Sequence, residues 1–374
     1  MFVFRVIASM QHSTILTICL SFALSLLGGC GGSGSDTPPA PGPVAGPSCS
    51  VAQLEGAMDS TLAQTSSDVD FSFSVERQDG RRYSYNRGGS TLLTSYESAS
   101  TSKMVSAVII LRLVEQGYLR LTDKPQERIS GWPITSSSNS LYNMTLEHLL
   151  SFTSGLTIEP LCLNSGAAIF DTCVNTIATT NAGNGMTPGQ EFYYASTHLQ
   201  VAGLMAIKAR GVATWQDVFT EFKTQTGLFP TATYDLPSAT NPRLAGGMHW
   251  TGDEYMAFLK ALKNGSLLNS TSMGQLLADH TASAAMTYSP ALVGAGEDWH
   301  YGLGLWHECQ SATFNCTAGT RVSSPGAYGA YPFWDRSKAY FGIVARQGTL
   351  GTFQNGIAIE RSVRPDVEQW LACP

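Results

Sequence analysis

The stretch Ser98-Ala-Ser-Thr-Ser-Lys-Met104 stands directly before the apolar run Val105-Ser-Ala-Val-Ile-Ile-Leu-Arg-Leu113. Serine and threonine favour the first positions of a helix, so one interpretation is a simple helix start with a solvated lysine. The other depends on Ser100 and Lys103, which form the only Ser-x-x-Lys pattern in the chain. Residues three apart share a face of a helix, so this spacing places a hydroxyl beside an amine. Because a serine becomes a good nucleophile when a base takes its proton, the pattern favours a nucleophilic Ser100.

The bulk composition limits the class of protein. The chain has 374 residues, of which 43% are hydrophobic and 13% charged, enough for one large domain or two closely joined ones. The formal net charge is −6 and the basic residues form no run. This charge pattern argues against a nucleic-acid partner.

The N-terminus has the pattern of an export signal. Arg5 precedes the apolar stretch 15–27, which is too short for a dependable membrane span. That stretch ends Leu26-Leu-Gly-Gly-Cys30 and is followed by a Gly-, Pro- and Ser-rich tract. It resembles a bacterial lipoprotein signal, in which the cysteine is acylated and becomes the mature N-terminus. We therefore expect a signal peptide over 1–29, lipidation at Cys30, a tether over 30–48 and a globular domain over 49–374.

An ordinary secretory signal with an incidental cysteine is the alternative. Gly31 after the cysteine resembles the outer-membrane sorting pattern. The expected location is therefore the bacterial cell envelope, with a lipid anchor in the outer membrane that faces the periplasm or the surface.

Cysteine usage agrees with export. Apart from Cys19 and Cys30, six cysteines remain, and an even number in an exported protein indicates disulfides. Short spacing favours Cys162–Cys173 and Cys309–Cys316, which leaves Cys49–Cys373 to join the ends of the globular part. Metal binding is disfavoured because neither Cys-x-x-Cys nor His-Glu-x-x-His occurs, and we expect no metal and no other cofactor.

Hydrophobic periodicity predicts a sheet built from both ends of the chain. Residues 51–62 have helical spacing, and residues 71–76 and 82–86 alternate on either side of a turn, as in a β-hairpin. The pattern is mostly helical from 100 to about 265, and residues 301–306, 329–334 and 338–346 are predicted strands. A last helix is predicted from Pro365, a residue suited to a first helical position. The two terminal helices would then cover one face of the sheet.

Four further stretches give Ser100 and Lys103 a context. They are Thr145-Leu-Glu-His-Leu-Leu-Ser-Phe-Thr-Ser-Gly-Leu156, Pro188-Gly-Gln-Glu-Phe-Tyr-Tyr-Ala-Ser196, Gly246-Gly-Met248 with the segment 253–265, and Tyr301-Gly-Leu-Gly-Leu-Trp306. In this order and spacing, they resemble the β-lactamase-related serine hydrolases, which include class C β-lactamases, DD-peptidases and family VIII carboxylesterases. The resemblance covers about residues 70–360.

The resemblance implies an α+β fold of the β-lactamase/transpeptidase-like type. Its antiparallel sheet would come from about 49–99 and 298–374, with terminal helices beside it, and its mostly helical part from about 100–297. Ser100 would be the nucleophile. Tyr194 would form a hydrogen bond with Ser100 and carry the Ser100 proton to the leaving group. Either Lys103 or Tyr194 could be the base in the free enzyme. The backbone N–H groups of Ser100 and Ala327 would form the oxyanion hole.

The chain departs from the family pattern at two motifs. Ser196 stands where β-lactamases carry asparagine, and the third motif falls at Ser324-Pro-Gly326, where no cation is present. Together with His198, the residues Ser196, Ser324 and Gly326 are the candidate substrate-binding residues. A substrate carboxylate would lose a charge-assisted partner worth roughly 1.5–3 kcal/mol.

The departures favour a carboxylesterase that acts on neutral acyl esters through an acyl-enzyme. A DD-peptidase, β-lactamase or amidase activity is the alternative. A non-catalytic binding protein on the same fold is the second alternative, and the joint presence of Ser100, Lys103 and Tyr194 argues against it. The expected partners are a small-molecule ester or amide and, through the lipid anchor, a membrane.

Overall fold

The computed structural model describes residues 49–374. The expected signal peptide, Cys30 and the tether lie outside the described residues. Among the helices of residues 49–374, none is long and apolar enough to cross a membrane.

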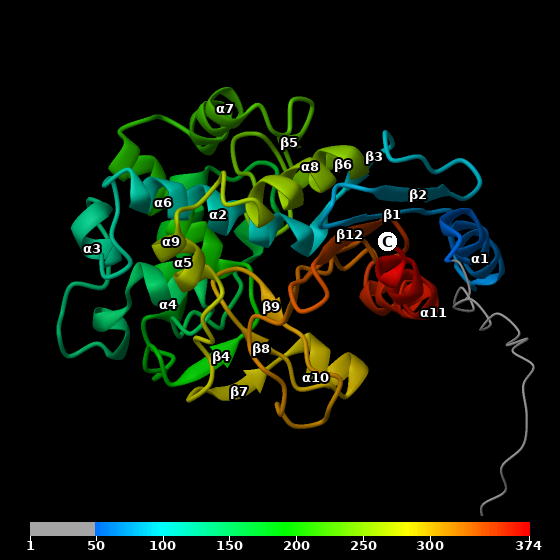
Figure 1. Cartoon of the computed structure of the whole chain (residues 1–374). Helices are drawn as coiled ribbons and strands as arrows, with labels where there is room; N and C mark the ends of the chain where they lie inside the picture. The colour runs from blue at the N-terminus through cyan, green and yellow to red at the C-terminus, as the bar shows by residue number, and fades with distance from the viewer. Residues whose placement is uncertain (1–48) are drawn as a thin grey trace, which may run out of the picture. The chain divides into compact units, whose positions relative to one another are not determined.

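A seven-stranded antiparallel sheet forms from the two ends of the described chain (Figure 1), which confirms the predicted fold class. Its strand order is β2-β1-β12-β11-β10-β9-β8. The strands are β1 (Ser72–Arg77), β2 (Arg82–Asn86), β8 (His300–Tyr301), β9 (Trp306–His307), β10 (Arg321–Ser323), β11 (Tyr331–Asp335) and β12 (Tyr340–Ala345). The last strand pairs with the first, from Ser72 opposite Ala345 to Arg77 opposite Tyr340. The early hairpin therefore becomes an edge of a sheet whose other strands come from the end of the chain.

One predicted sheet element needs correction, and one strand of the sheet was not predicted. Residues 301–306 are not one strand: β8 and β9 are two short strands joined by a turn in which Gly304 has φ +77°. Glycine adopts this left-handed conformation without the penalty of a Cβ atom, so a tight reversal is possible there. The sequence also gave no sign of β10, a three-residue strand whose side chains are all buried.

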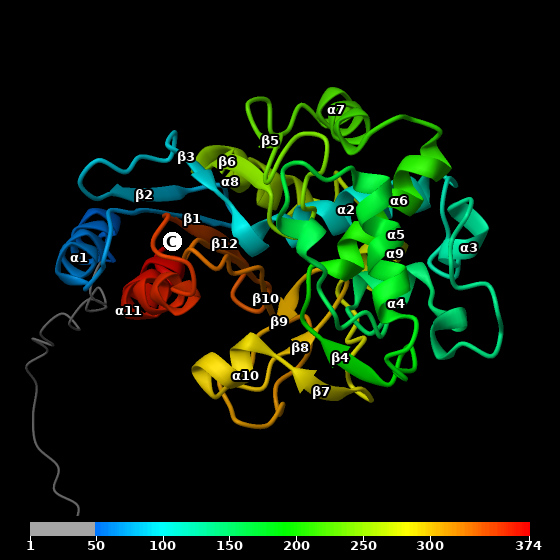
Figure 2. The same cartoon turned by 180° about the vertical axis from the view of Figure 1, so that it is seen from behind.

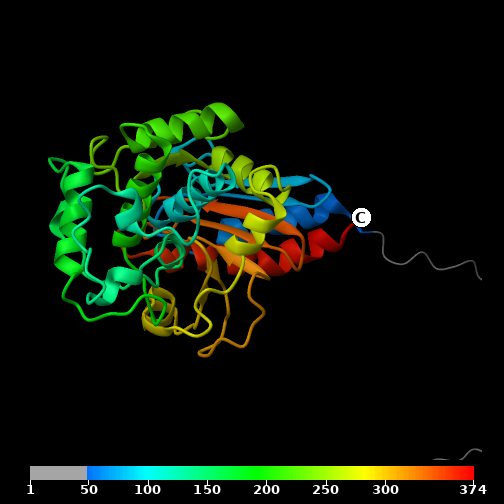
Figure 3. The ribbon, with the colours of Figure 1, turned by 90° about the vertical axis from the view of Figure 1, so that its left-hand side faces the viewer.

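The terminal helices α1 (Val51–Gln64) and α11 (Phe353–Ala372) pack side by side on one face of the sheet, and α8 (Gly252–Lys263) packs on the other (Figures 1 and 3). The Cys49–Cys373 disulfide joins the outer ends of α1 and α11, and the Thr61 hydroxyl donates to the Asp366 carboxylate at 2.6 Å. Helix α11 begins twelve residues before the predicted start, so Pro365 lies inside it. Burial of its apolar face outweighs the backbone hydrogen bond that proline removes.

The helical part of the molecule surrounds α2 (Ser102–Glu115), which packs against α6 (Thr197–Arg210) (Figure 2). Eleven of the fourteen α2 residues are buried, so a helix that is covered on nearly all sides forms the core of this part. The other helices here are α3 (Pro125–Arg128), α4 (Leu146–Leu150), α5 (Phe170–Asn181), α7 (Trp215–Thr226), α9 (Ser270–Leu276) and α10 (Pro290–Ala295).

Two small sheets, which the sequence did not predict, pair segments that lie between the helices of this part. They are β3 (Ser95–Glu97), β5 (Thr233–Tyr234) and β6 (Met248–Thr251), in the order β3-β6-β5, and the parallel pair β4 (Glu191–Tyr193) and β7 (Ala285–Tyr288). The first sheet leads directly into the turn that carries Ser100, and β4 leads into Tyr194. Both therefore hold segments of the candidate site.

Candidate active site

Ser100 lies in a single 3-10 turn, Ala99–Thr101, that continues into α2. Ala99 has φ +43°, a left-handed conformation that strains a non-glycine residue by about 1–3 kcal/mol. Neighbouring segments hold this turn. The Ser98 N–H donates to the Met248 carbonyl at 2.8 Å, and the Tyr255 hydroxyl donates to the Thr101 carbonyl at 2.8 Å. The half-buried Ser100 side chain is thus fixed by contacts on both sides of it.

The side chain of Lys103 lies one turn further along α2 and meets Ser100. Its Nζ donates to Ser100 Oγ at 2.8 Å and to the Ala245 carbonyl at 2.9 Å. Burial lowers the pKa of Lys103 to about 7, and the positive charge of Arg243 contributes in the same direction, while Glu159 opposes it. The Lys103 amine is therefore neutral in much of the population near neutral pH and can accept a proton.

Tyr194 follows β4 and lies against both residues. Its ring stacks on Trp306 with centroids 5.0 Å apart, and Lys103 Nζ is 4.6 Å from the ring centre. Its N–H donates to the Tyr288 carbonyl at 3.0 Å, which fixes the loop. Burial raises the pKa of the Tyr194 phenol above its usual value, an effect that the Ser100 side chain partly opposes. The phenol consequently carries its proton near neutral pH.

The backbone N–H of Ala327 is a candidate donor for an oxyanion hole. Ala327 lines the same cavity as Ser100, and its N–H makes no hydrogen bond to any other residue of 49–374, although its carbonyl accepts from the Gly351 N–H at 2.9 Å. A backbone donor of this kind can stabilise negative charge that develops on a substrate oxygen.

The cavity beside Ser100 has a volume of about 70 Å³. Side chains from the sheet, α10, α11 and the Tyr194 loop form its walls, and no charged side chain lies among them. The lining residues are Ser100, Tyr194, Pro290, Ala291, Trp299, Trp306, Pro325, Ala327 and Phe353. Ser100 and Tyr194 supply the polar side-chain oxygens, and the remaining wall is apolar apart from the indole N–H groups and the backbone.

Two of the predicted substrate-binding residues, Ser324 and Gly326, instead support the nucleophile. The Ser324 hydroxyl is buried and donates to the Ser100 carbonyl at 2.9 Å. A Cβ atom at Gly326 would lie 2.5 Å from the Ser98 carbonyl oxygen, so glycine permits the close approach of the sheet to the Ser100 turn. Neither residue lines the cavity.

His198 is a core residue, which corrects its expected contact with substrate. Its side chain is fully buried, its Nδ1 is 2.7 Å from the Ser154 hydroxyl, and its Nε2 is 2.8 Å from the Tyr193 carbonyl. A carbonyl only accepts, so Nε2 carries the hydrogen and Nδ1 accepts from Ser154. Burial lowers the pKa of His198 to about 3, which leaves the ring neutral. Its role is to hold the backbone next to Tyr194.

Ser196 also lies outside the cavity lining. Its backbone N–H donates to the Glu159 carboxylate, and it precedes α6 as the N-cap residue. The residues that sequence reasoning missed are the apolar walls Pro290, Ala291, Trp299 and Phe353. They lie at the start of a helix or at the end of a loop and belong to no sequence motif. The local sequence pattern therefore did not identify them as cavity residues.

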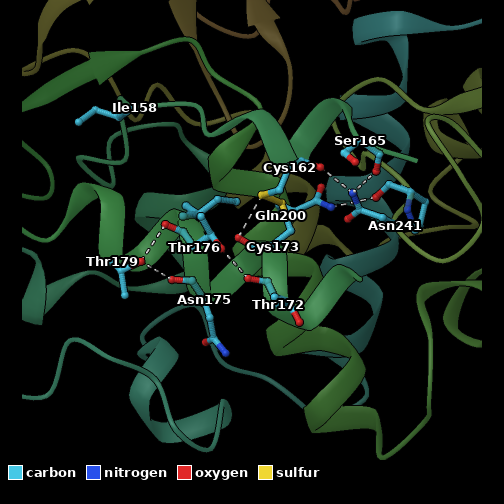
Figure 4. Close-up of a disulfide and its surroundings, with 12 residues drawn as sticks. Ile158, Cys162, Ser165, Thr172, Cys173, Asn175, Thr176, Thr179, Gln200 and Asn241 are labelled. Atoms are coloured by element: carbon cyan, nitrogen blue, oxygen red, sulfur yellow. Dashed lines mark hydrogen bonds between the residues drawn. A yellow bond between two sulfur atoms is a disulfide. The ribbon is translucent and has the colours of Figure 1, made fainter. Parts of the chain in front are cut away.

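The segment that accepts the Lys103 hydrogen bond is anchored to a disulfide loop (Figure 4). Asn241 Nδ2 donates to the Cys162 carbonyl at 2.8 Å and to the Ser165 carbonyl at 3.2 Å. Gln200 of α6 donates to the Pro242 carbonyl at 3.0 Å and accepts from the Leu244 N–H at 3.2 Å. The Cys162–Cys173 disulfide joins this loop to α5. The three disulfides of the described chain are the predicted pairs, two of them favoured by short spacing and Cys49–Cys373 left by elimination.

The fold and this site together define a class, the serine hydrolases of the β-lactamase/transpeptidase-like fold. A family model described as Beta-lactamase matches residues 76–354, and the chain belongs to this family. No curated protein sequence matches the chain significantly.

Solved structures show the same fold at low sequence identity. A putative beta-lactamase from Bacteroides dorei DSM 17855 is 22% identical with a TM-score of 0.69, and the match covers 84% of this chain and 98% of that one. EstCE1, a hydrolase with promiscuous acyltransferase activity, is 17% identical with a TM-score of 0.65 over 84% and 98%. D-amino acid amidase from Ochrobactrum anthropi SV3 is 16% identical with a TM-score of 0.62 over 86% and 100%.

Proposed function

We propose that the protein is a carboxylesterase that hydrolyses neutral acyl esters through an acyl-enzyme on Ser100. The observation that carries this proposal is the cavity beside Ser100, whose walls hold no charged side chain. A β-lactam or peptide carboxylate would have to leave water there without a charged partner, which is unfavourable. Ser324, at the position of the usual cation, is turned toward the Ser100 carbonyl.

In the proposed first step, the neutral Lys103 amine takes the Ser100 proton while Oγ attacks the ester carbonyl carbon. The carbonyl oxygen becomes negative and accepts from the Ser100 and Ala327 N–H groups. Lys103 qualifies as the base in the free enzyme because burial lowers its pKa to about 7, whereas burial raises the pKa of Tyr194. With Lys103 as the base, Tyr194 is the group that protonates the leaving alcohol.

In the second step, the carbon–oxygen bond to the alcohol breaks. Tyr194 gives its proton to the departing alkoxide and regains one from the Lys103 ammonium, which leaves an ester on Ser100 and a free alcohol. A water molecule then attacks this ester and gives its proton to the same pair. The bond to Ser100 Oγ breaks, Oγ recovers a proton, and the carboxylic acid leaves.

The test is hydrolysis of p-nitrophenyl acetate by the purified protein, together with labelling by a fluorophosphonate probe. We expect the wild type to turn over and to be labelled, and Ser100→Ala to lose both properties. Ser60→Ala is a control, because Ser60 lies on α1 and its hydroxyl bonds only to the Gly56 carbonyl within its own helix. Full activity in Ser100→Ala contradicts the assignment, and absence of labelling in a folded wild type favours a binding protein.

A parallel panel of esters, D-amino acid amides and β-lactams separates the activities found on this fold. One solved relative is an amidase and another is a hydrolase with acyltransferase activity. Amide turnover above ester turnover would therefore contradict the carboxylesterase proposal and favour an amidase. We expect ester turnover to exceed amide and β-lactam turnover.

We further propose export to the cell envelope with a lipid anchor at Cys30. Three disulfides support an oxidising compartment, because such bonds persist outside the reducing cytosol. Cell fractionation of the wild type and of Cys30→Ser tests the anchor. We expect the wild type in the membrane fraction and Cys30→Ser outside it, and equal membrane association contradicts the anchor.

A further inference from the structure

The position of Tyr194 identifies which part of an ester fits the cavity. The phenol and the Trp306 ring stacked on it form one wall, and Ser100 lies at the same cavity. If Tyr194 protonates the departing oxygen, that oxygen must lie within hydrogen-bond reach of the phenol. The carbon skeleton bound to it, which belongs to the alcohol and not to the acyl group, then extends along this wall.

The other walls are apolar and firmly held. Trp299 Nε1 donates to Glu297 at 2.8 Å, and Glu297 forms a two-point ion pair with Arg361 of α11, at 2.7 and 2.8 Å. Phe353 stands at the first turn of α11, and a Cβ atom at Gly294 of α10 would lie 2.8 Å from its ring. Helices α10 and α11 are therefore in direct contact beside the cavity, with Phe353 between them.

The size and chemistry of the cavity select a class of alcohol. About 70 Å³ of free space suits a short alkyl or small aryl group. A negatively charged alcohol would lose its hydration without a partner among the walls, whereas an apolar one gains from burial, roughly 25 cal/mol per Å².

We propose that this cavity is the alcohol-binding subsite, that it takes small uncharged apolar alcohols, and that Phe353 sets its length limit. The proposal rests on the esterase function proposed above. It assigns the selectivity of the enzyme to the leaving group.

The experiment uses two matched substrate series with the full exported protein. In the first, the acetyl group is constant and the alcohol varies: ethyl, butyl and octyl acetate, and the equally shaped pair 3-methylbutyl acetate and 3-acetoxypropanoate, which carries a carboxylate. In the second, p-nitrophenol is constant and the acyl group varies from acetyl to octanoyl. Acid release at constant pH gives kcat/KM for each ester.

We expect the wild type to prefer the neutral member of the shape-matched pair, and butyl over octyl acetate, each by about tenfold or more. Phe353→Ala should raise the octyl-to-butyl ratio by about tenfold and leave the order within the acyl series unchanged. Leu350→Ala is the control, because Leu350 is 71% exposed and does not line the cavity, and it should keep both profiles.

Each other outcome has a defined meaning. A shift of the acyl series in Phe353→Ala, with the alcohol series unchanged, places the acyl group in the cavity and overturns the proposal. Equal turnover of 3-acetoxypropanoate and its neutral counterpart overturns the apolar selection. Absence of hydrolysis across both series contradicts the esterase function itself, so the two failures are distinguishable.

Discussion

The Ser324 hydroxyl donates a 2.9 Å hydrogen bond to the main-chain carbonyl of Ser100. The residue at the third motif is therefore coupled to the nucleophile through the backbone, and its side chain is 2% exposed. This contact joins the end of β10 in the large sheet to the turn that precedes α2, the two parts of the fold between which the site lies.

Replacing Ser324 tests this coupling. Ser324→Ala leaves the Ser100 carbonyl without its side-chain donor, so we expect the free energy of unfolding to fall by about 1–2 kcal/mol. We expect kcat with p-nitrophenyl acetate to fall several-fold, because the Ser100 turn loses one support. Urea denaturation and initial rates measure both effects. Ser324→Thr keeps a hydroxyl and should restore both, and an unchanged Ser324→Ala protein would show that the contact is dispensable.

The pH dependence of the reaction should report Lys103. Burial lowers its pKa to about 7, and only the neutral amine can accept the Ser100 proton. We therefore expect kcat/KM to rise with pH through about 7 and to level off above it, because Lys103 is protonated at lower pH. Lys103→Arg, which stays protonated, should lose activity over the whole range.

A histidine offers the control for that profile. Burial opposes protonation of His280, but contacts with the Glu147 carboxylate and the Gln275 carbonyl outweigh it and raise the pKa of this ring above its usual value. His280 does not line the cavity. His280→Gln should keep the acidic limb in place, and a displaced limb would assign it to His280.

The phenol of Tyr194 should matter for turnover more than for binding. Tyr194→Phe keeps the ring that stacks on Trp306 but removes the proton donor. We expect kcat to fall by about 10²–10⁴-fold with KM within a few-fold of the wild type. Substrates with a good leaving group, such as p-nitrophenol, need less protonation and should lose less than alkyl esters. An equal loss for both leaving groups would contradict proton delivery by Tyr194.

The Cys162–Cys173 disulfide should support catalysis through Asn241 and the segment that holds Lys103 (Figure 4). Replacing both cysteines by serine should lower the free energy of unfolding by about 2–3 kcal/mol, as expected for a short loop. We expect kcat to fall as well, and the acidic limb of the pH profile to shift, because the Ala245 carbonyl that accepts from Lys103 becomes less fixed.

The disulfide at the ends of the domain is the matched comparison. Loss of Cys49–Cys373 opens a far longer loop and should cost about 5 kcal/mol or more. Because it lies at the outer ends of α1 and α11, kcat of the folded fraction should stay unchanged at low temperature. Equal effects of the two variants on kcat would remove the special role of Cys162–Cys173.

A buried ion cluster should dominate the stability of the sheet. Arg321 of β10 contacts Glu308, Asp335 and Glu360 at 3.2, 3.1 and 2.8 Å, and all four side chains are buried. Arg321→Met leaves these carboxylates undercompensated, so we expect a loss of about 3–5 kcal/mol in denaturant unfolding. Lys208→Ala removes an exposed pair with Asp171 and should change stability by no more than about 1 kcal/mol. Similar losses in both variants would argue against a special role for burial.

Local sequence was sufficient for the parts of this protein that depend on spacing. The Ser100–Lys103 pair needs only a helical turn, and the structure shows the two side chains 2.8 Å apart. The early hairpin and α1 follow from alternation and periodicity, two disulfide pairs follow from short cysteine spacing, and Cys49–Cys373 follows by elimination. Hydrophobic periodicity predicted a sheet built from both chain ends, and the resemblance of the ordered motifs to the β-lactamase-related serine hydrolases predicted the type of fold.

Tertiary structure decided which side chains face the cavity. Three residues in or beside motif segments do not face it. The His198 side chain lies in the core, the Ser324 hydroxyl contacts the Ser100 carbonyl, and Gly326 packs against the backbone beside Ser100. Trp299 and Phe353 belong to no motif, yet they form walls of the cavity. The start of α11 and the short strand β10 escaped prediction for the same reason. The direction of a loop side chain, and the ends of an element within a packed core, depend on partners far away in the sequence, and no local period encodes them.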